Sequence, residues 1–301
     1  ANVFSVDQLV VGLTNTSRSV GYADGSVWVD TVNGTAGVEV FVNGTADKPV
    51  LTWADALTIA ASVGIDKFYI GSGSTITMSA NFDGYEVNGG NWNLVLDENY
   101  TVSGTTFHGA DITGTAAAGA ARAHFHHCEF AAVTIPPSVI ENCGIGADAG
   151  TFTAGGAGQY VFVNCYSMVA GSGTPTFDFS GQGSTTGINN RGWFGGANYT
   201  LDSDCTISHE VVAGGGQTFT TGGANVELRG LCRSVRLVLS SAGTVQAIVN
   251  TGPIAISGTA TTTVNLYGLS SSVTDTSVNT TVNDYTKGDV PTAVDASTAG
   301  I

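Results

Sequence analysis

The sequence predicts an all-β protein built as a solenoid of stacked coils. Three observations lead to this fold class. The chain of 301 residues contains 42 glycines, and only 11% of its residues are charged. Thr, Val, Ser and Asn are abundant, and these residues favour strands and turns over helices. Short strand-like segments recur between Gly, Asn, Asp or Ser turns at spacings of about 20 residues, which is typical of one solenoid turn.

The composition also excludes several classes of partner. The chain carries 24 Asp and Glu against 9 Lys and Arg, a formal net charge of -15. So few cations cannot neutralise many phosphates, so we expect no nucleic-acid partner. No run of about 18 apolar residues is present, which excludes insertion in a membrane as a helix. Low charge with 42% hydrophobic residues argues against intrinsic disorder.

Four segments are distinguished along the chain. Residues 1–46 form a strand-rich lead-in or attachment segment, and residues 47–70 a capping helix with the first strand. Residues 71–270 form the β-helix, and residues 271–301 are either a C-terminal tail or a strand exchanged with a neighbour.

The lead-in segment contains two expected strands. They are Val27–Val29 and Val38–Val42, separated by the turn-like pair Asn33 and Gly34. Both runs are rich in β-branched residues, which favour strands. Either these strands pack on the main domain, or the segment serves as an attachment arm.

A single helix is predicted over residues 53–62. Apolar residues recur there every three or four positions, as on one face of a helix. Thr52 is placed to cap the first turn, and Gly64 to end the helix. A strand over residues 67–70 follows. Solenoids need a covered first coil, and a helix placed before the repeats is suited to provide it.

Three similar segments define the repeat. Around Cys128, Cys143 and Cys165, an apolar residue is followed two positions later by a polar residue and then directly by Cys. The cysteines lie 15 and 22 residues apart, which fits a cysteine ladder on successive coils. A β-sandwich would explain short strands but not these units. Further strands are expected over residues 235–239, 245–249 and 263–267.

The cysteine usage indicates a reduced core. The chain has 5 cysteines, an odd number, and none in a closely spaced pair. This argues against a disulfide framework and against a zinc site. We therefore expect buried thiols that pack as small apolar side chains.

The opening of the repeat region resembles a known class of protein. Residues 44–49 (Gly-Thr-Ala-Asp-Lys-Pro), 53–57 (Trp-Ala-Asp-Ala-Leu) and 64–70 (Gly-Ile-Asp-Lys-Phe-Tyr-Ile) resemble the start of right-handed parallel β-helix proteins of the pectate-lyase-like class. More narrowly, they resemble β-helix proteins of tailed bacteriophages: tailspikes, head fibres and capsid decorations. The resemblance covers roughly residues 26–270.

This resemblance implies an assembly and a location. Such proteins are homotrimers on the virion surface. The chain would then be assembled in the host cytoplasm and joined to other virion proteins, in the capsid or the neck and tail, through its N-terminal segment.

The candidate catalytic residues are a pair of carboxylates. A pectate lyase would need a Ca²⁺-binding carboxylate cluster and a basic catalytic residue, and the sequence shows no such cluster. Tailspike glycosidases use two carboxylates, and the best pair is Asp202 with Asp204, which share a face if they lie on a strand. Trp193, Phe194 and Tyr199 lie just upstream and are candidates for stacking on sugar. The alternative is a solvated turn beside ordinary core aromatics.

The candidate metal ligands are two histidines. His124 and His126 share one face of a strand, and neutral imidazole is a good ligand for transition metals where three chains meet. The alternative is polar stacking on a solvent face or at a trimer interface. No cofactor is expected.

Two functions follow from these observations. The first is structural: a trimeric β-helix that decorates a phage capsid or forms a head fibre. The alternative is a tail appendage or tailspike that adsorbs to host surface glycans, with or without glycosidase activity. The central repeats contain few charged residues where a polysaccharide hydrolase would most need them, so the structural function ranks first and enzymatic activity stays open.

Overall fold

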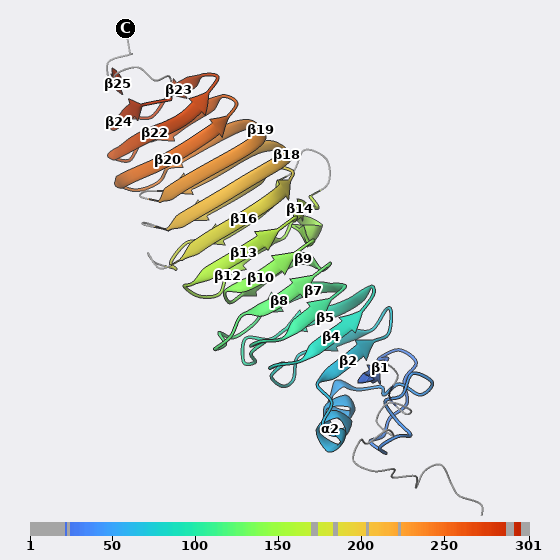
Figure 1. The fold of residues 1–301 in the computed structure, drawn as a ribbon. Helices are drawn as coiled ribbons and strands as arrows, with labels where there is room; N and C mark the ends of the chain where they lie inside the picture. The colour runs from blue at the N-terminus through green and yellow to red at the C-terminus, as the bar shows by residue number, and fades with distance from the viewer. Residues whose placement is uncertain are drawn as a thin grey trace, which may run out of the picture.

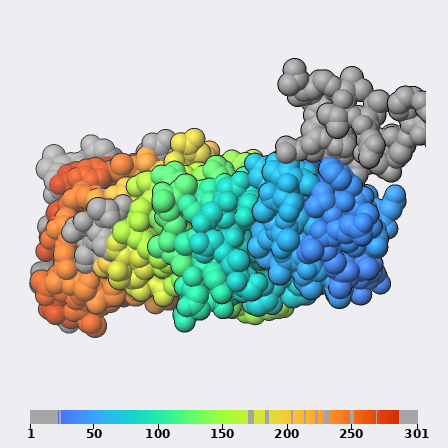
Figure 2. All heavy atoms as spheres, turned by 90° about the horizontal axis from the view of Figure 1, so that it is seen from below, coloured from blue at the N-terminus to red at the C-terminus, as the bar shows by residue number. Residues whose placement is uncertain are grey.

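The computed structural model shows a parallel β-solenoid of about 10 turns. It describes residue 22 and residues 25–169, 174–182, 186–202, 205–221, 224–286 and 292–295. Figure 1 shows the coils stacked along one axis, from blue to red, and Figure 2 shows the resulting rod from below. The predicted all-β solenoid is therefore confirmed. The start of the predicted lead-in, residues 1–21, lies outside the described residues.

The first face of the coil contains one strand from nearly every turn, and neighbouring strands pair in parallel. Its strands are β1 (Val27–Val29), β2 (Lys67–Ile70), β4 (Glu86–Gly89), β6 (Thr106–His108), β8 (Ala123–His126), β10 (Ser138–Glu141), β13 (Gln159–Val163), β16 (Gly187–Phe194), the first parts of β18 (Thr206–Thr221) and β19 (Asn225–Leu239), and β20 (Gly243–Thr251), β22 (Thr262–Ser270) and β24 (Thr280–Asp284).

The second and third faces complete each turn. The second face holds β3 (Thr75–Thr77), β5 (Trp92–Leu96), β7 (Ala110–Thr115), the first part of β9 (Glu129–Ile135), β11 (Gly144–Ile145) and β14 (Tyr166–Ser167). The third face holds the end of β9, β12 (Thr151–Ala154), β15 (Thr176–Phe179), β17 (Ala197–Leu201), the later parts of β18 and β19, β21 (Ile254–Gly258) and β23 (Val273–Asp275).

Inward side chains of the first face stack into a continuous core. Phe107, Phe125 and Phe162 occupy the same inward column and are fully buried. The rings of Phe107 and Phe125 stack with centroids 5.2 Å apart. Burial of each such ring stabilises the fold by about 1.5–3 kcal/mol, so the core contributes most of the stability of the stack.

The corner between the first and second faces uses one residue of left-handed conformation in successive coils. His127, Asn142 and Asn164 have φ of 54°, 54° and 53°. Each directly precedes a cysteine, and the left-handed turn directs that cysteine inward. This explains the repeated polar-residue-plus-Cys units, because Asn adopts the left-handed region more readily than most side chains.

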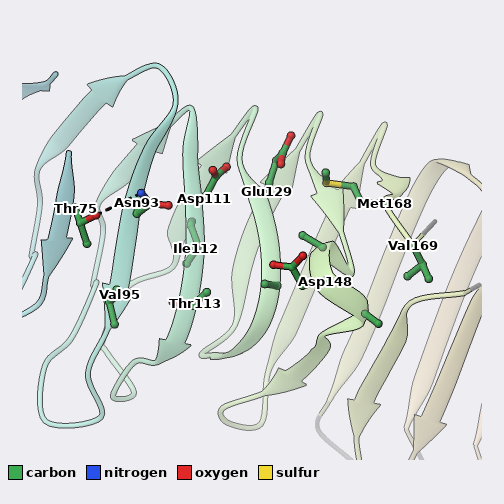
Figure 3. A pocket seen from close by; sticks show the side chains of 13 residues that line it. Thr75, Asn93, Val95, Asp111, Ile112, Thr113, Glu129, Asp148, Met168 and Val169 are labelled. Carbon is green, nitrogen blue, oxygen red and sulfur yellow. Dashed lines mark hydrogen bonds between the residues drawn. The ribbon is translucent and has the colours of Figure 1, made fainter. Parts of the chain in front are cut away.

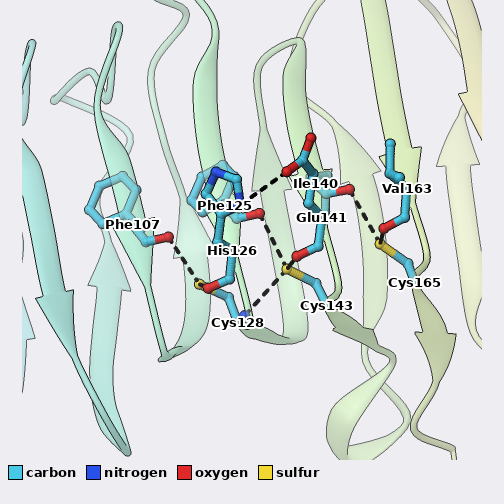
Figure 4. A network of polar contacts seen from close by, with 9 residues as sticks. All are labelled: Phe107, Phe125, His126, Cys128, Ile140, Glu141, Cys143, Val163 and Cys165. Atoms are coloured by element: carbon cyan, nitrogen blue, oxygen red, sulfur yellow. Dashed lines mark hydrogen bonds and ion pairs between the residues drawn. The ribbon is translucent and has the colours of Figure 1, made fainter.

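The cysteines form a ladder of thiols against the backbone, shown in Figure 4. The Cys143 thiol lies 3.5 Å from the carbonyl oxygen of Phe125 in the preceding coil, and the backbone N–H of Cys128 donates to the Cys143 sulfur at 3.3 Å. Burial raises the pKa of the Cys143 thiol far above its usual range. The prediction of buried, reduced thiols is confirmed for Cys128, Cys143, Cys165 and Cys205.

The helix α2 spans Trp53–Val63, close to its predicted range. The Thr52 hydroxyl accepts a backbone N–H of the first turn at 3.1 Å, and Gly64 ends the helix at φ 67°. Both predicted caps are confirmed. The buried Trp53 ring stacks on Phe82 of the first coils with centroids 4.2 Å apart. Figure 1 places α2 at the blue end of the stack.

The predicted strand over Val38–Val42 is wrong. This segment forms a turn, in which the Glu39 carbonyl accepts the backbone N–H of both Val42 and Asn43. Phe41 has a φ of 64°, which no strand residue adopts. The Asn43 side chain also accepts the Glu39 N–H at 3.2 Å. Alternating valines predict a strand only where a partner edge is present.

The later predicted strands are confirmed as parts of β19, β20 and β22. Parallel pairing continues past residue 270, since β23 pairs with β21 and β24 with β22. A further strand, β25 (Thr292–Asp295), pairs antiparallel with β24. No helix within the described ranges is long and apolar enough to cross a membrane.

One part of the core is polar. Asn190 and His209 occupy the inward column of the first face in place of the phenylalanines. The Asn190 amide donates to the Tyr199 hydroxyl at 2.9 Å, and His209 Nε2 lies 3.2 Å from Gln217 Oε1. Desolvation lowers the pKa of His209 to about 4. The imidazole is therefore neutral in the folded protein at neutral pH.

Candidate functional site

A groove of about 820 Å³ lies on the outer surface of the second face. Its floor contains one outward column of polar side chains, one from each of four successive strands, shown in Figure 3. Thr75, Asn93, Asp111 and Glu129 occupy this column in parallel register. The Asn93 amide donates to the Thr75 hydroxyl at 3.3 Å. The groove therefore crosses the strands and follows the axis of the rod.

The outward direction of this column follows from strand alternation. Successive side chains of a strand point to opposite faces. Leu94, Ile112 and Phe130, which follow the polar residues, are buried in the core. The preceding polar side chains of the same strands are therefore held on the outside, on a rigid backbone.

Asp111 and Glu129 form a pair of like charges. They are direct partners on neighbouring strands, which lie about 4.8 Å apart. Partial desolvation raises the pKa of Asp111. Desolvation, and next the charge of Asp111, raises the pKa of Glu129. Within the described structure, neither carboxylate has a hydrogen bond or ion pair with another side chain.

One wall of the groove is an excursion of the chain between β11 and β12. It contains the 3₁₀ helix η3 (Ala147–Ala149), in which Asp148 and Ala149 have φ of 52° and 56°. The backbone N–H of Gly146 donates to the Phe130 carbonyl at 2.9 Å and ties the excursion to the floor. Asp148 is exposed on this wall and lines the groove.

Met168 completes the wall beside the carboxylates. A Cβ atom at Gly144 would lie 2.1 Å from the Met168 sulfur, so the absence of a side chain at Gly144 leaves the space that Met168 fills. Val169 lies beside it and also lines the groove. The floor column of acidic groups therefore ends against an apolar surface.

Two exposed aromatic rings continue the same outward column. Gly144 pairs with both Glu129 and Tyr166, and Tyr166 pairs with Phe194. Tyr166 is 40% exposed and Phe194 44%. Desolvation, and next the charge of Glu129, raises the pKa of Tyr166. Carboxylates, an apolar wall and aromatic faces are thus aligned on one side of the rod.

The other predicted sugar-stacking rings lie inside the coil. Trp193 and Tyr199 are 0% and 1% exposed, so no sugar outside the coil can stack on them. Gly192, with φ 72°, forms the corner that directs Trp193 inward and the next residue outward. Tyr199 stacks on the Phe219 ring with centroids 5.3 Å apart. Of the three predicted rings, only Phe194 is available at the surface.

The predicted carboxylate pair cannot be placed as a pair. Asp202 directly follows β17 and is half-buried, whereas Asp204 lies outside the described residues. The prediction that these two carboxylates converge therefore stays a prediction.

The histidines form a ladder on the outer surface of the first face. The rings of His124 and His126 lie on the same side, with centroids 6.5 Å apart. His126 also stacks on His108 at 4.9 Å and lies 3.1 Å from the Glu141 carboxylate. Desolvation, and next the charge of His126, lowers the pKa of His108. In the part of the chain that the structure describes, no group of three or more His, Cys, Asp or Glu is placed to hold a metal ion.

The acidic pair had a signal in the sequence. Asn93, Asp111 and Glu129 lie at equal intervals of 18 residues, and each directly precedes a large apolar residue. A constant interval with a fixed polar-apolar order indicates equivalent positions on successive coils. The pattern is short and spans only three coils, which makes it hard to distinguish in a chain of irregular period.

Comparisons with protein-family models, with curated proteins and with solved structures find no match to this chain. The description of the site therefore rests on its own geometry.

Proposed function

We propose that this chain is a structural protein of the surface of a tailed-bacteriophage virion, a homotrimeric right-handed β-helix that decorates the capsid or forms a head fibre. The carrying observation is the uninterrupted rod of about 10 parallel turns. Backbone groups in such a rod bond from coil to coil, which gives a stiff element without metal or disulfide. The right-handed sense is the one that parallel crossover connections favour.

Exposed apolar side chains on the first face support trimerisation. Ile248 and Tyr267 are direct partners on neighbouring coils and are 41% and 39% exposed. Tyr267 stacks on Tyr285 of the next coil with centroids 4.9 Å apart. Val212 on β18 is 44% exposed. A soluble chain gains free energy when such a surface is covered, and copies of the same chain would cover it in a trimer.

The N-terminal region supports attachment to another virion protein. Val32, Val38, Phe41 and Val42 are between 38% and 62% exposed within one short segment. The turn that replaces the predicted strand presents these side chains outward. We assign the contact with capsid, neck or tail proteins to this segment, and we assign to helix α2 the role of shielding the first coil from water.

Two measurements test the structural proposal. Sedimentation equilibrium of the purified chain is expected to give three times the mass of the monomer. Electron microscopy of intact particles carrying a labelled copy is expected to place the label on the capsid surface. A monomer at high concentration would contradict the trimer, and a particle without the chain would contradict the virion assignment.

A second candidate function is adsorption to host surface glycans through the groove on the second face. The specific observation is the alignment of Asp111 and Glu129 with the exposed rings of Tyr166 and Phe194. Sugars present hydroxyl groups at their edges and C–H groups on their faces, so they fit a surface that offers carboxylates and aromatic rings together. Glycosidase activity at Asp202 and Asp204 stays a separate prediction.

Glycan binding is tested with a panel of purified bacterial surface polysaccharides, measured by biolayer interferometry. At least one polysaccharide is expected to bind, and the Tyr166→Ala/Phe194→Ala variant to bind it at least about tenfold more weakly, since loss of stacking removes about 1–3 kcal/mol. Tyr69→Ala on the first face is the control for loss of an exposed tyrosine. Binding that survives the double substitution would exclude this groove.

A further inference from the structure

We infer that the groove on the second face selects an oligosaccharide that carries free amino groups over its neutral counterpart. This inference rests on the glycan-binding function proposed above and adds the charge of the ligand. It is carried by the arrangement of charges in the groove.

All charged side chains that line the groove are acidic. They are Asp111 and Glu129 on the floor and Asp148 on the wall, and no Lys, Arg or His of the described structure lines it. The two basic groups nearest in the column order belong to the first face, where Lys67 is paired with Glu86 at 3.1 Å. A bound ligand therefore meets uncompensated negative charge.

The floor pair is built to accept one cation between its members. Asp111 and Glu129 are register partners, so their side chains leave the sheet side by side. Both have raised pKa values because they are partly desolvated, and Glu129 also because of its neighbour. An ammonium group between them would offset the repulsion and supply three hydrogen-bond donors to two acceptors. A neutral acetamide offers one donor and leaves the repulsion in place.

The surroundings favour an amino sugar over a bare cation. Two carboxylates alone supply too few ligands for a metal ion, and no larger group is present in the described ranges. Val95 and Met168 line the groove beside the acidic column. They offer contact to the C–H faces of a sugar ring while its amino group reaches the carboxylates. The ligand class that satisfies both surfaces is an amine-bearing carbohydrate.

The test compares two probes with the same backbone. They are a β-1,4-linked glucosamine oligomer and its fully N-acetylated form, measured by isothermal titration calorimetry at about pH 6 and low salt. The free-amine oligomer is expected to bind at least about tenfold more tightly, which corresponds to about 1.4 kcal/mol. The preference is expected to shrink as salt is added, because exposed charges are screened.

Matched variants locate the effect. The double variant Asp111→Asn/Glu129→Gln is expected to abolish the preference, so that both oligomers bind alike. Glu98→Gln removes one charge from an exposed residue outside the groove and is expected to keep it. Thermal unfolding shows whether each variant is folded, and the single variants Asp111→Asn and Glu129→Gln serve if the double variant is not. A preference that persists in the double variant would overturn the inference.

The outcome also separates this inference from the function on which it rests. If a polysaccharide of the panel binds the groove but free amines give no advantage, the charge selectivity falls and glycan binding stands. If no member of the panel and neither oligomer binds, both proposals fall. A second readout is the pKa of the two carboxyl groups by NMR, which is expected to fall when the free-amine oligomer binds.

Discussion

His209 Nε2 and Gln217 Oε1 lie 3.2 Å apart inside the solenoid, at a level of the stack where the phenylalanine column is interrupted. Both side chains are 1% exposed. A buried amide oxygen accepts a hydrogen bond from a neutral imidazole, which has one N–H donor. A charged imidazole at this place would carry a large desolvation penalty. The pair therefore links the stability of these coils to pH.

The stability of the protein is expected to fall as pH decreases from about 6.5 to 4. Burial lowers the pKa of His209 from 6.5 to about 4, so the unfolded chain binds the proton first. Between these values each pH unit favours unfolding by about 1.4 kcal/mol, or about 3 kcal/mol in total. Urea unfolding at a series of pH values measures the slope. The His209→Gln variant is expected to lose this part of it, whereas exposed His124→Gln keeps it. An unchanged slope in His209→Gln would refute the assignment.

Removal of one charge from the groove is expected to stabilise the fold at neutral pH. A carboxyl whose pKa is raised by folding destabilises the protein once pH exceeds that raised value, and has no effect below its unfolded pKa. Asp111→Asn is therefore expected to increase the free energy of unfolding at pH 7 by roughly 0.2–1 kcal/mol, and to change nothing near pH 3. Glu98→Gln is the control. A loss of stability at pH 7 would show that Asp111 has a favourable partner.

Two glycines of left-handed conformation are expected to respond differently to alanine. Gly73 has a φ of 78° with open space around its Cα, so Gly73→Ala is expected to cost only the conformational penalty of about 1–2 kcal/mol. At Gly109, with φ 67°, a Cβ would lie 2.3 Å from the Gly89 carbonyl oxygen. Gly109→Ala is expected to cost about 1–3 kcal/mol more. Equal midpoints of urea unfolding for the two variants would contradict the close coil spacing at this corner.

The buried thiols are expected to resist alkylation in the folded protein. Cys143 and Cys165 are 0% exposed, and burial raises the pKa of the Cys165 thiol to about 11. The thiolate is the reactive form, so both are protected by access and by protonation. Iodoacetamide at about pH 8, followed by peptide mass spectrometry, is expected to label them only after addition of urea. Rapid labelling of either cysteine in the native protein would show that the ladder opens.

Local features of the fold were predictable because their causes are local. Thr52 and Gly64 delimit the helix through their own backbone preferences, and the Asn residues before Cys143 and Cys165 mark corners for the same reason. The strand expected over Val38–Val42 failed because a strand needs a partner edge, which the composition of a segment does not reveal.

The candidate site was less predictable. Phe194 was identified among three aromatic candidates, but nothing in its neighbourhood distinguished it from Trp193. A single left-handed residue, Gly192, reverses which side of the coil the next two side chains take. Asp111 and Glu129 are 18 residues apart in sequence, and only the register of β7 with β9 makes them neighbours.

The sequence by itself determined the class of fold: glycine and asparagine corners, short β-branched strands and one capped helix leave a solenoid as the consistent architecture. Local backbone preference and side-chain alternation are sufficient for that result. The tertiary structure alone decided which polar residues share a column, which aromatic rings reach the surface, and that a histidine sits in the core. These depend on the number of residues in each coil, because a change of one residue shifts every later side chain to the opposite face.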